Sequence, residues 1–104
     1  MEIISNKTLS AEIAASCFAA LGSEQRLIVL KTLVRAGKNG LSIGQLGERS
    51  GVAGSTLTHH LKILSQSGLI VQTKKGRSII CAAMSFGEIK RLSDFLLHQC
   101  CADS

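Results

Sequence analysis

The sequence predicts one mainly α-helical domain over residues 1–104, with five helices and one small β-hairpin in the order α-α-α-α-β-β-α. Apolar residues recur at helical spacing in five segments, and glycines or capping residues bound these segments. Two β-rich runs lie next to each other near residue 75. Of the 104 residues, 45% are apolar and none is Pro, Trp or Tyr, which suits a small helical core.

The first two helices are predicted from their caps. The first runs from about Thr8 or Ser10 to Ala20, and a Gly-Ser pair follows it. The second has Ser23 as its N-cap and ends at Gly37. We expect one apolar stripe of the second helix to face the core. This stripe consists of Leu27, Leu30 and Val34.

The middle of the chain predicts two short helices in succession. Residues 42–45 form a capping box that begins a helix over Ile43–Ser50. Gly51 suits the left-handed position after that helix. The next helix begins near Ala53 and stops at Gly68. Its predicted core stripe consists of Leu57, Leu61 and Leu64.

The last third of the chain predicts a hairpin and a long helix. Residues 69–73 and 78–82 are β-rich and flank a basic tip at 74–77. Residues 85–88 form a second capping box, which opens a helix to about Cys101. The apolar stripe of this helix consists of Phe86, Ile89, Leu92, Phe95 and Leu96.

The excess positive charge lies in one stretch. The chain has 12 basic and 7 acidic residues, a formal charge of +5. No acidic residue lies between Glu48 and Glu88, and the other seven basic residues balance the seven acidic ones. The five basic residues of the stretch are Arg49, Lys62, Lys74, Lys75 and Arg77. Such a segment attracts a polyanion, because neutralised phosphates release counterions, although charge alone leaves a merely solvated surface open.

Two short helices joined at Gly51 and followed by a basic hairpin predict a winged helix-turn-helix unit, whose second helix enters the major groove of DNA. With the leucine stripe facing inward, hydroxyl and cationic side chains remain on the other side, and these suit phosphates and base edges. We therefore expect double-stranded operator DNA as a partner. The predicted contacts are Ser55, Thr56, Thr58, His59, Lys62, Lys74, Lys75 and Arg77. His60 lies between the two faces and is interpreted as a hydrogen-bonded structural residue.

Four segments carry a family resemblance: Leu21–Leu27, Ser55–Leu64, Gly68–Ile70 and Gly76-Arg77. In this order they resemble the signature of the ArsR/SmtB repressors, over about residues 13–101. The resemblance implies a homodimer whose first and last helices pack across the two-fold axis, and which releases operator DNA when an inducer binds. One departure is Ala53, where the family often has a Ser N-cap; such a loss costs about 1 kcal/mol of helix stability.

A homodimer is also expected on physical grounds. The apolar stripes of the first and last helices exceed what one small winged domain can cover, and two-fold symmetry matches palindromic half-sites.

Several inducer sites of that family are absent here. Its thiolate pair at the start of the third helix is replaced by Ser42 and Gly44, and the spacing of its last-helix Asp/His zinc site is not found. The helix-two cysteine of a sulfur-responsive subgroup is replaced by Lys31.

The adjacent pair Cys100 and Cys101 remains, and it resembles an arsenic-responsive subgroup with a C-terminal Cys-Cys pair. Soft thiolates select soft metals and metalloids. We therefore expect a trivalent arsenical, arsenite or methylarsenite, as the inducer and no required cofactor. A third ligand could be Cys17, including that of a partner subunit, or Cys81, or be unnecessary for a methylated arsenical. Cys17 and Cys81 are alternatively small apolar core residues.

Thiol-redox or reactive-sulfur sensing is the main alternative for the cysteine pair. The negative end of the last helix would raise a thiol pKa, which favours coordination over oxidation. Catalysis is not expected: His98 and Cys101 mimic a base and a nucleophile, but no orienting acid or phosphate loop accompanies them.

The chain is expected to be cytoplasmic, with no membrane partner. Its N-terminus is acidic at Glu2, and the apolar run from Ile13 to Leu21 is too short to span a bilayer. The four cysteines are then expected to be reduced.

Overall fold

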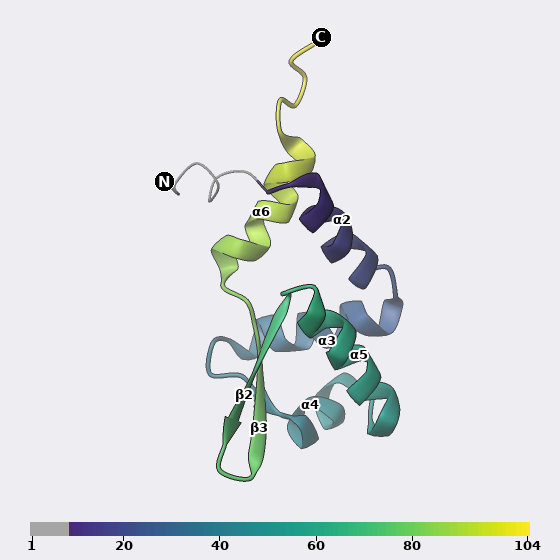
Figure 1. The fold of residues 1–104 in the computed structure, drawn as a ribbon, viewed down its shortest axis with the longest axis vertical. Coiled ribbons are helices and arrows are strands. Elements are labelled where there is room, and N and C mark those ends of the chain that lie inside the picture. The colour runs from purple at the N-terminus through teal and green to yellow at the C-terminus, as the bar shows by residue number, and fades with distance from the viewer. Residues whose placement is uncertain (1–8) are drawn as a thin grey trace.

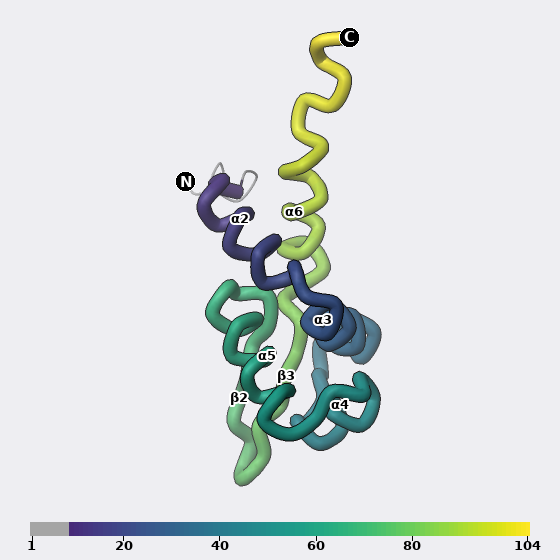
Figure 2. Tube along the Cα trace, turned by 90° about the vertical axis from the view of Figure 1, so that its right-hand side faces the viewer, coloured from purple at the N-terminus to yellow at the C-terminus, as the bar shows by residue number. Residues whose placement is uncertain are grey.

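The computed structural model describes residues 9–104 and confirms the mainly α fold with a hairpin wing. The helices are α2 (Ala11–Ala20), α3 (Glu24–Ala36), α4 (Ile43–Ser50), α5 (Gly54–Gln66) and α6 (Phe86–Leu97). The strands are β1 (Leu41–Ser42), β2 (Ile70–Lys75) and β3 (Ser78–Ala83). Helices α3, α4 and α5 gather with the hairpin, whereas α2 and α6 lie at the other end of the molecule (Figure 1). Helix α6 extends away from this body in both views (Figure 2).

Side-chain caps set most helix starts as the sequence predicts. Ser10 caps α2 by accepting a hydrogen bond from the amide of Ile13; the alternative start at Thr8 lies outside the described residues. Both capping boxes form, at the starts of α4 and α6. Gly51 adopts the left-handed conformation, with φ 78°. Ala53 gives α5 no side-chain cap, as its methyl group requires.

The sheet has one strand more than predicted. Its order is β1-β3-β2, and both pairs are antiparallel. Strand β1 has two residues, of which Leu41 pairs with Cys81, and so short a strand has no periodicity in the sequence. The hairpin loop is also tighter than the predicted four residues. Lys75 pairs with Ser78, which leaves only Gly76 and Arg77 in the turn.

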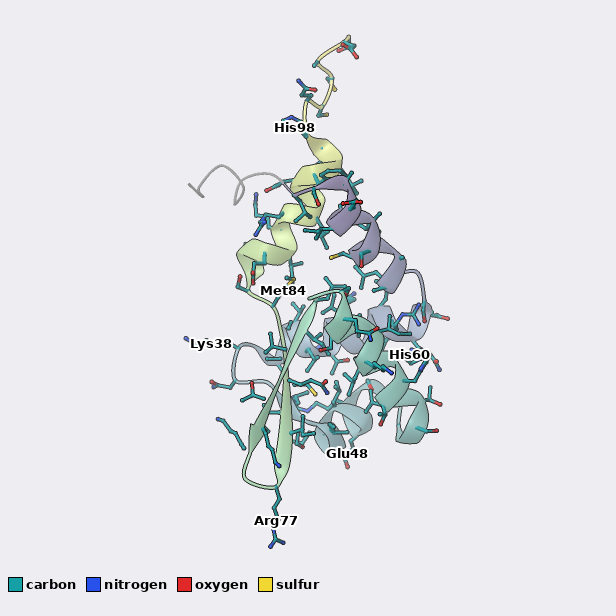
Figure 3. All side chains as sticks on the ribbon, viewed as in Figure 1. Lys38, Glu48, His60, Arg77, Met84 and His98 are labelled. Carbon is teal, nitrogen blue, oxygen red and sulfur yellow. The ribbon has the colours of Figure 1, made fainter. Side chains whose placement is uncertain are left out.

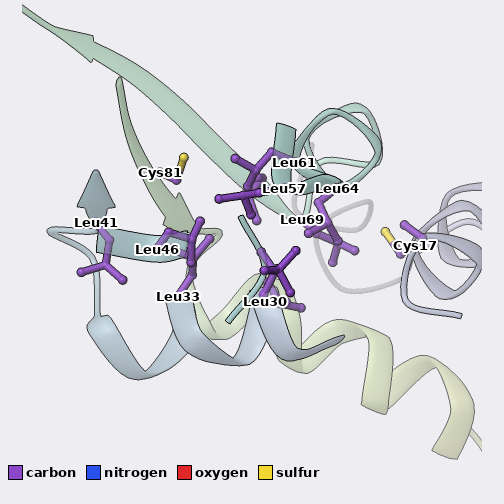
Figure 4. Packing of buried hydrophobic residues seen from close by; sticks show 14 of the residues in the cluster. Cys17, Leu30, Leu33, Leu41, Leu46, Leu57, Leu61, Leu64, Leu69 and Cys81 are labelled. Carbon is purple, nitrogen blue, oxygen red and sulfur yellow. The ribbon is translucent and has the colours of Figure 1, made fainter. Parts of the chain in front are cut away.

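The hydrophobic core lies between α3, α4, α5 and the sheet (Figure 4). Its largest fully buried side chains include Leu33, Leu46, Leu57, Leu61, Leu64 and Leu69. The predicted stripe of α5 is therefore confirmed.

The stripe predicted for α3 is partly wrong. Leu30 is buried, but Leu27 and Val34 are 43% and 49% exposed, and Val29 and Leu33 take their places in the core. The segment from residue 27 to 34 is apolar at six of eight positions. Two faces of the helix therefore fit the same spacing, and only packing against the other elements selects one of them.

The end predicted for the last helix is also wrong. Helix α6 stops at Leu97, and residues 98–103 form turns in which Gln99 and Cys101 have positive φ angles of 60° and 64°. No Gly or Pro marks this stop in the sequence.

Within residues 9–104, no single helix is long and apolar enough to cross a membrane. Helices α2 and α3 meet that criterion of length and composition only as a pair bent by 101°.

Candidate nucleic-acid interface

Helix α5 turns its polar side away from the core. Leu57, Leu61 and Leu64 are at most 1% exposed, so the rest of the helix surface is left to other side chains. All five contact residues predicted on this helix are exposed: Ser55, Thr56, Thr58, His59 and Lys62. They combine hydroxyl groups, an imidazole and a cation, which are suitable partners for phosphates and base edges.

The hairpin carries the other three predicted contacts, all exposed. Lys74 and Lys75 are the last residues of β2, and Arg77 lies in the turn, where its side chain extends beyond the end of the hairpin (Figure 3). Because side chains alternate along a strand, Lys74 shares a face with Gln72, whose partner in β3 is the buried Cys81. Lys75 points from the opposite face, so the tip presents cations on both sides.

A groove joins α5 to the hairpin. It has a volume of about 340 Å³, and its lining includes Thr58 and Lys62 from the helix and Gln72 and Ile79 from the strands. Two of the predicted contact residues thus border the same hollow as the inner face of the hairpin. The helix and the hairpin form one continuous surface rather than two separate ones.

Sequence reasoning missed a neighbouring hollow at the start of α4. This hollow, of about 360 Å³, lies between residues 42–44 and residues 77–79. The first turn of α4 contains no acidic residue, and the N-terminus of a helix carries a partial positive charge. The start of α4 therefore adds to the positive potential of Arg77. The capping box marked the helix start in the sequence, but only the fold brings it beside the hairpin.

His60 is a structural residue, as expected. Its side chain is 8% exposed, and its Nε2 atom lies 2.9 Å from Oε1 of Gln25. Because a carbonyl oxygen can only accept, Nε2 carries the proton and Nδ1 is left to accept from Nη1 of Arg26, at 3.4 Å. Nε of Arg26 also donates to the carbonyl of Ala20 at 2.6 Å. These contacts join α5 to the corner between α2 and α3.

The neutral imidazole is favoured at this position. Burial lowers the pKa of His60 below its ordinary value of 6.5, and the positive charge of Arg26 and the neighbouring His59 lower it further. A second ring proton on Nδ1 would also point at a guanidinium that has no acceptor.

The exposed cysteine pair lies in the turns after α6. Cys100 and Cys101 have their Sγ atoms 3.4 Å apart, and both side chains are exposed. The amide of Cys100 donates to the carbonyl of Leu97, the last residue of the helix. The pair therefore follows α6 instead of forming its last turn, where the field of the helix dipole is strongest.

The other two cysteines are buried. Cys17 donates its thiol to the carbonyl of Ser67 at 3.4 Å, and Cys81 lies beside Nε2 of Gln72 at 3.7 Å. Burial raises the pKa of both thiols, which opposes formation of the thiolate that binds metals. Residues 9–104 contain no group of three His, Cys, Asp or Glu side chains placed to hold a metal ion within one chain.

The pKa of His60 predicts a pH dependence of folding. Well above pH 6.5 the ring is neutral in both the folded and unfolded chains. As the pH falls below 6.5, the unfolded chain takes up the proton first, and the free energy of unfolding decreases by at most about 1.4 kcal/mol per pH unit. Urea unfolding between pH 5 and 8 should show this slope in the wild type and a flatter one in His60→Gln.

His59→Gln is the matched control, because His59 is the exposed neighbour of the same residue type. It should keep the wild-type slope. An unchanged slope in His60→Gln would show that His60 does not titrate differently in the two states.

Comparison with known proteins agrees with this geometry. Residues 21–73 match a family model described as a helix-turn-helix domain. The chain is 37% identical over 67 residues to the uncharacterized HTH-type transcriptional regulator YceK of Bacillus subtilis, covering 64% of this chain and 66% of that protein, just under two thirds. It is 32% identical over 85 residues to the HTH-type transcriptional regulator NmtR of Mycobacterium tuberculosis, covering 81% and 68%.

Its structure is similar to that of an ArsR-like transcriptional regulator from Rhodococcus sp. RHA1, with a TM-score of 0.69, 30% identity and coverage of 88% and 82% of the two chains. The chain belongs to the helix-turn-helix transcriptional regulators of the ArsR/SmtB type.

Proposed function

We propose that this chain is a homodimeric transcriptional repressor that binds operator DNA through α5 and the hairpin. A trivalent arsenical bound to Cys100 and Cys101 then releases the DNA. The observation that carries the DNA part is the exposure of all eight predicted contact residues on two adjoining elements. The opposite side of α5 is filled by core leucines.

Electrostatics supports DNA as the partner. From residue 49 to residue 87 the chain contains five basic residues and no acidic residue. Lys62, on α5, and Arg77, at the hairpin tip, are at two separate points of this basic surface. Cations at separate points of one surface can contact different phosphates of a duplex, and each neutralised phosphate makes the affinity dependent on salt.

We expect Lys62→Gln and Arg77→Gln each to weaken DNA binding. Each substitution removes two phosphate contacts per dimer, so the slope of log K against log salt should become shallower by about 1.8. Fluorescence anisotropy with a short duplex across a KCl series measures this slope. Lys31→Gln, which removes an exposed charge on α3, is the control and should keep the wild-type slope. Wild-type slopes in both test variants would contradict the proposed interface.

Dimerisation is supported by apolar side chains that the single chain leaves uncovered. On α6 only Leu92 is buried, whereas Leu96 and Phe95 are 67% and 37% exposed. On the neighbouring α2, Ile13 is 53% exposed. An apolar surface of this kind on a soluble protein is typical of an interface. A second copy would cover it and set the two α5 helices at a fixed distance.

We expect Leu96→Glu to dissociate the dimer, because a carboxylate would be forced into an apolar interface without a partner. Sedimentation velocity at micromolar concentration should give the mass of a monomer. Val71→Glu places the same charge on another exposed apolar residue, on β2, and should leave the dimer intact. A Leu96→Glu dimer as tight as the wild type would contradict the interface.

The arsenical part of the proposal is supported by the chemistry of the cysteine pair. Two exposed thiols with sulfur atoms 3.4 Å apart need little rearrangement to bind one trivalent arsenic atom. A methylarsenical would be satisfied by these two thiols. Arsenite would take a third ligand, for which Cys17 of a partner subunit remains a candidate. Because the pair follows α6, binding acts on the same helix that carries the proposed dimer interface.

We expect arsenite or methylarsenite to release the wild type from DNA but not the Cys100→Ser, Cys101→Ser double variant. Anisotropy of the DNA complex, titrated under reducing conditions, measures release. Cys17→Ala tests the third ligand: it should weaken the response to arsenite and spare that to methylarsenite if Cys17 coordinates. Release of the double variant by an arsenical would exclude this pair as the site. Release only by a polysulfide would favour the redox alternative.

A further inference from the structure

An apolar cleft lies between α3 and the junction of β3 with α6, away from the cysteine pair. Its volume is about 540 Å³, and its walls are contributed by Leu33 and Val34 on one side and by Met84, Phe86 and Ile89 on the other. This size falls in the range of small-molecule sites, which are mostly apolar with a few polar groups that orient the ligand. The side chains that support the proposed dimer interface, Ile13, Phe95 and Leu96, are not among these residues.

Two side chains of the cleft are unusually exposed for their type. Phe86 is 78% exposed although it opens the apolar stripe of α6, and Val34 is 49% exposed although its neighbour Leu33 is fully buried. Neither is covered by another described part of the same chain. An apolar ligand body between them would remove both from water, which is favourable in proportion to the area covered.

The one charged side chain in the cleft lining is positive, which suits an anion. Lys38 is the one charged residue in the lining, and it forms no ion pair with another described residue. From Gln25 to Gly47 the chain has no acidic residue. The nearest carboxylate in sequence on the α6 side, that of Glu88, accepts hydrogen bonds from the amide and hydroxyl of Ser85 within the capping box. Lys38 and Met84, which line the cleft from its two sides, are labelled in Figure 3.

We propose that this cleft binds a small organic anion, with its apolar body between Val34 and Phe86 and a carboxylate head at Lys38. Such a ligand contacts α3 in the DNA-binding body and the first turn of α6 at the same time. A ligand that binds one orientation of α6 more tightly favours that orientation, and any effect on DNA affinity is matched by an equal effect of DNA on ligand affinity.

Decanoate is a suitable probe, and decyltrimethylammonium has a chain of the same length with the opposite head charge. Displacement of the fluorescent anion 1-anilinonaphthalene-8-sulfonate from the full chain measures both. Decanoate should bind more tightly than the cation. Val34→Trp fills the cleft and should weaken decanoate binding at least about tenfold. Lys38→Gln should weaken it roughly two- to fivefold, as expected for a partly solvated ion pair.

Two controls separate this site from the rest of the molecule. Lys31→Gln removes a charge on the same helix outside the cleft lining, and the Cys100→Ser, Cys101→Ser double variant removes the thiols. Both should bind decanoate like the wild type. Lys38→Gln, a surface substitution, carries the test if Val34→Trp does not fold.

Three results would overturn the proposal. The first is equal affinity for decanoate and the cation. The second is wild-type decanoate affinity in Lys38→Gln. The third is a folded Val34→Trp variant that keeps decanoate affinity but dissociates into monomers on sedimentation, which would make a second copy of this chain the occupant of the cleft.

Discussion

The burial of one face of α5 determines what the rest of the structure presents to solvent. Leu57, Leu61 and Leu64 lie in the core beside Leu33 and Leu46, all at most 1% exposed. Removing one such side chain costs about 2–5 kcal/mol, so rotation of the helix about its axis would be prohibitive. A fixed rotation fixes the outward side chains as well. The hydroxyl and cationic residues of α5 therefore face solvent because the leucines cannot.

A polar contact complements this apolar one. The ring of His60 is held by Gln25 and Arg26, and the same guanidinium binds the last carbonyl of α2, that of Ala20. A buried polar group that loses its partner costs about 1–3 kcal/mol, so these groups favour a single arrangement. Helix α2, which carries part of the proposed dimer surface, is thereby tied to α5, which carries the proposed DNA contacts. A change at the interface has a direct route to the DNA side.

The sequence predicts those features that depend on neighbouring residues. Both capping boxes, the left-handed Gly51 and the stripe of α5 follow from local spacing, and the structure has all of them. The buried face of α3 and the end of α6 depend on contacts from elsewhere in the chain, and both predictions failed. The cleft beside Lys38 has the same origin, because its two walls are about 50 residues apart in sequence and no local pattern joins them.

Two ligand sites on one helix would each supply part of the binding free energy that is needed to change the orientation of that helix. To change the ratio of two orientations of a helix from 99:1 to 1:99, ligands must bind the favoured orientation about 10⁴-fold more tightly than the other, a difference of about 5.5 kcal/mol. A symmetric dimer has two copies of each site, so the ligand at each copy needs to bind the favoured orientation only about 10²-fold more tightly. The cleft includes the first turn of α6, and the cysteine pair follows the other end of this helix. A ligand at either proposed site would act on the DNA contacts by favouring one orientation of this helix, and the two effects would therefore be coupled.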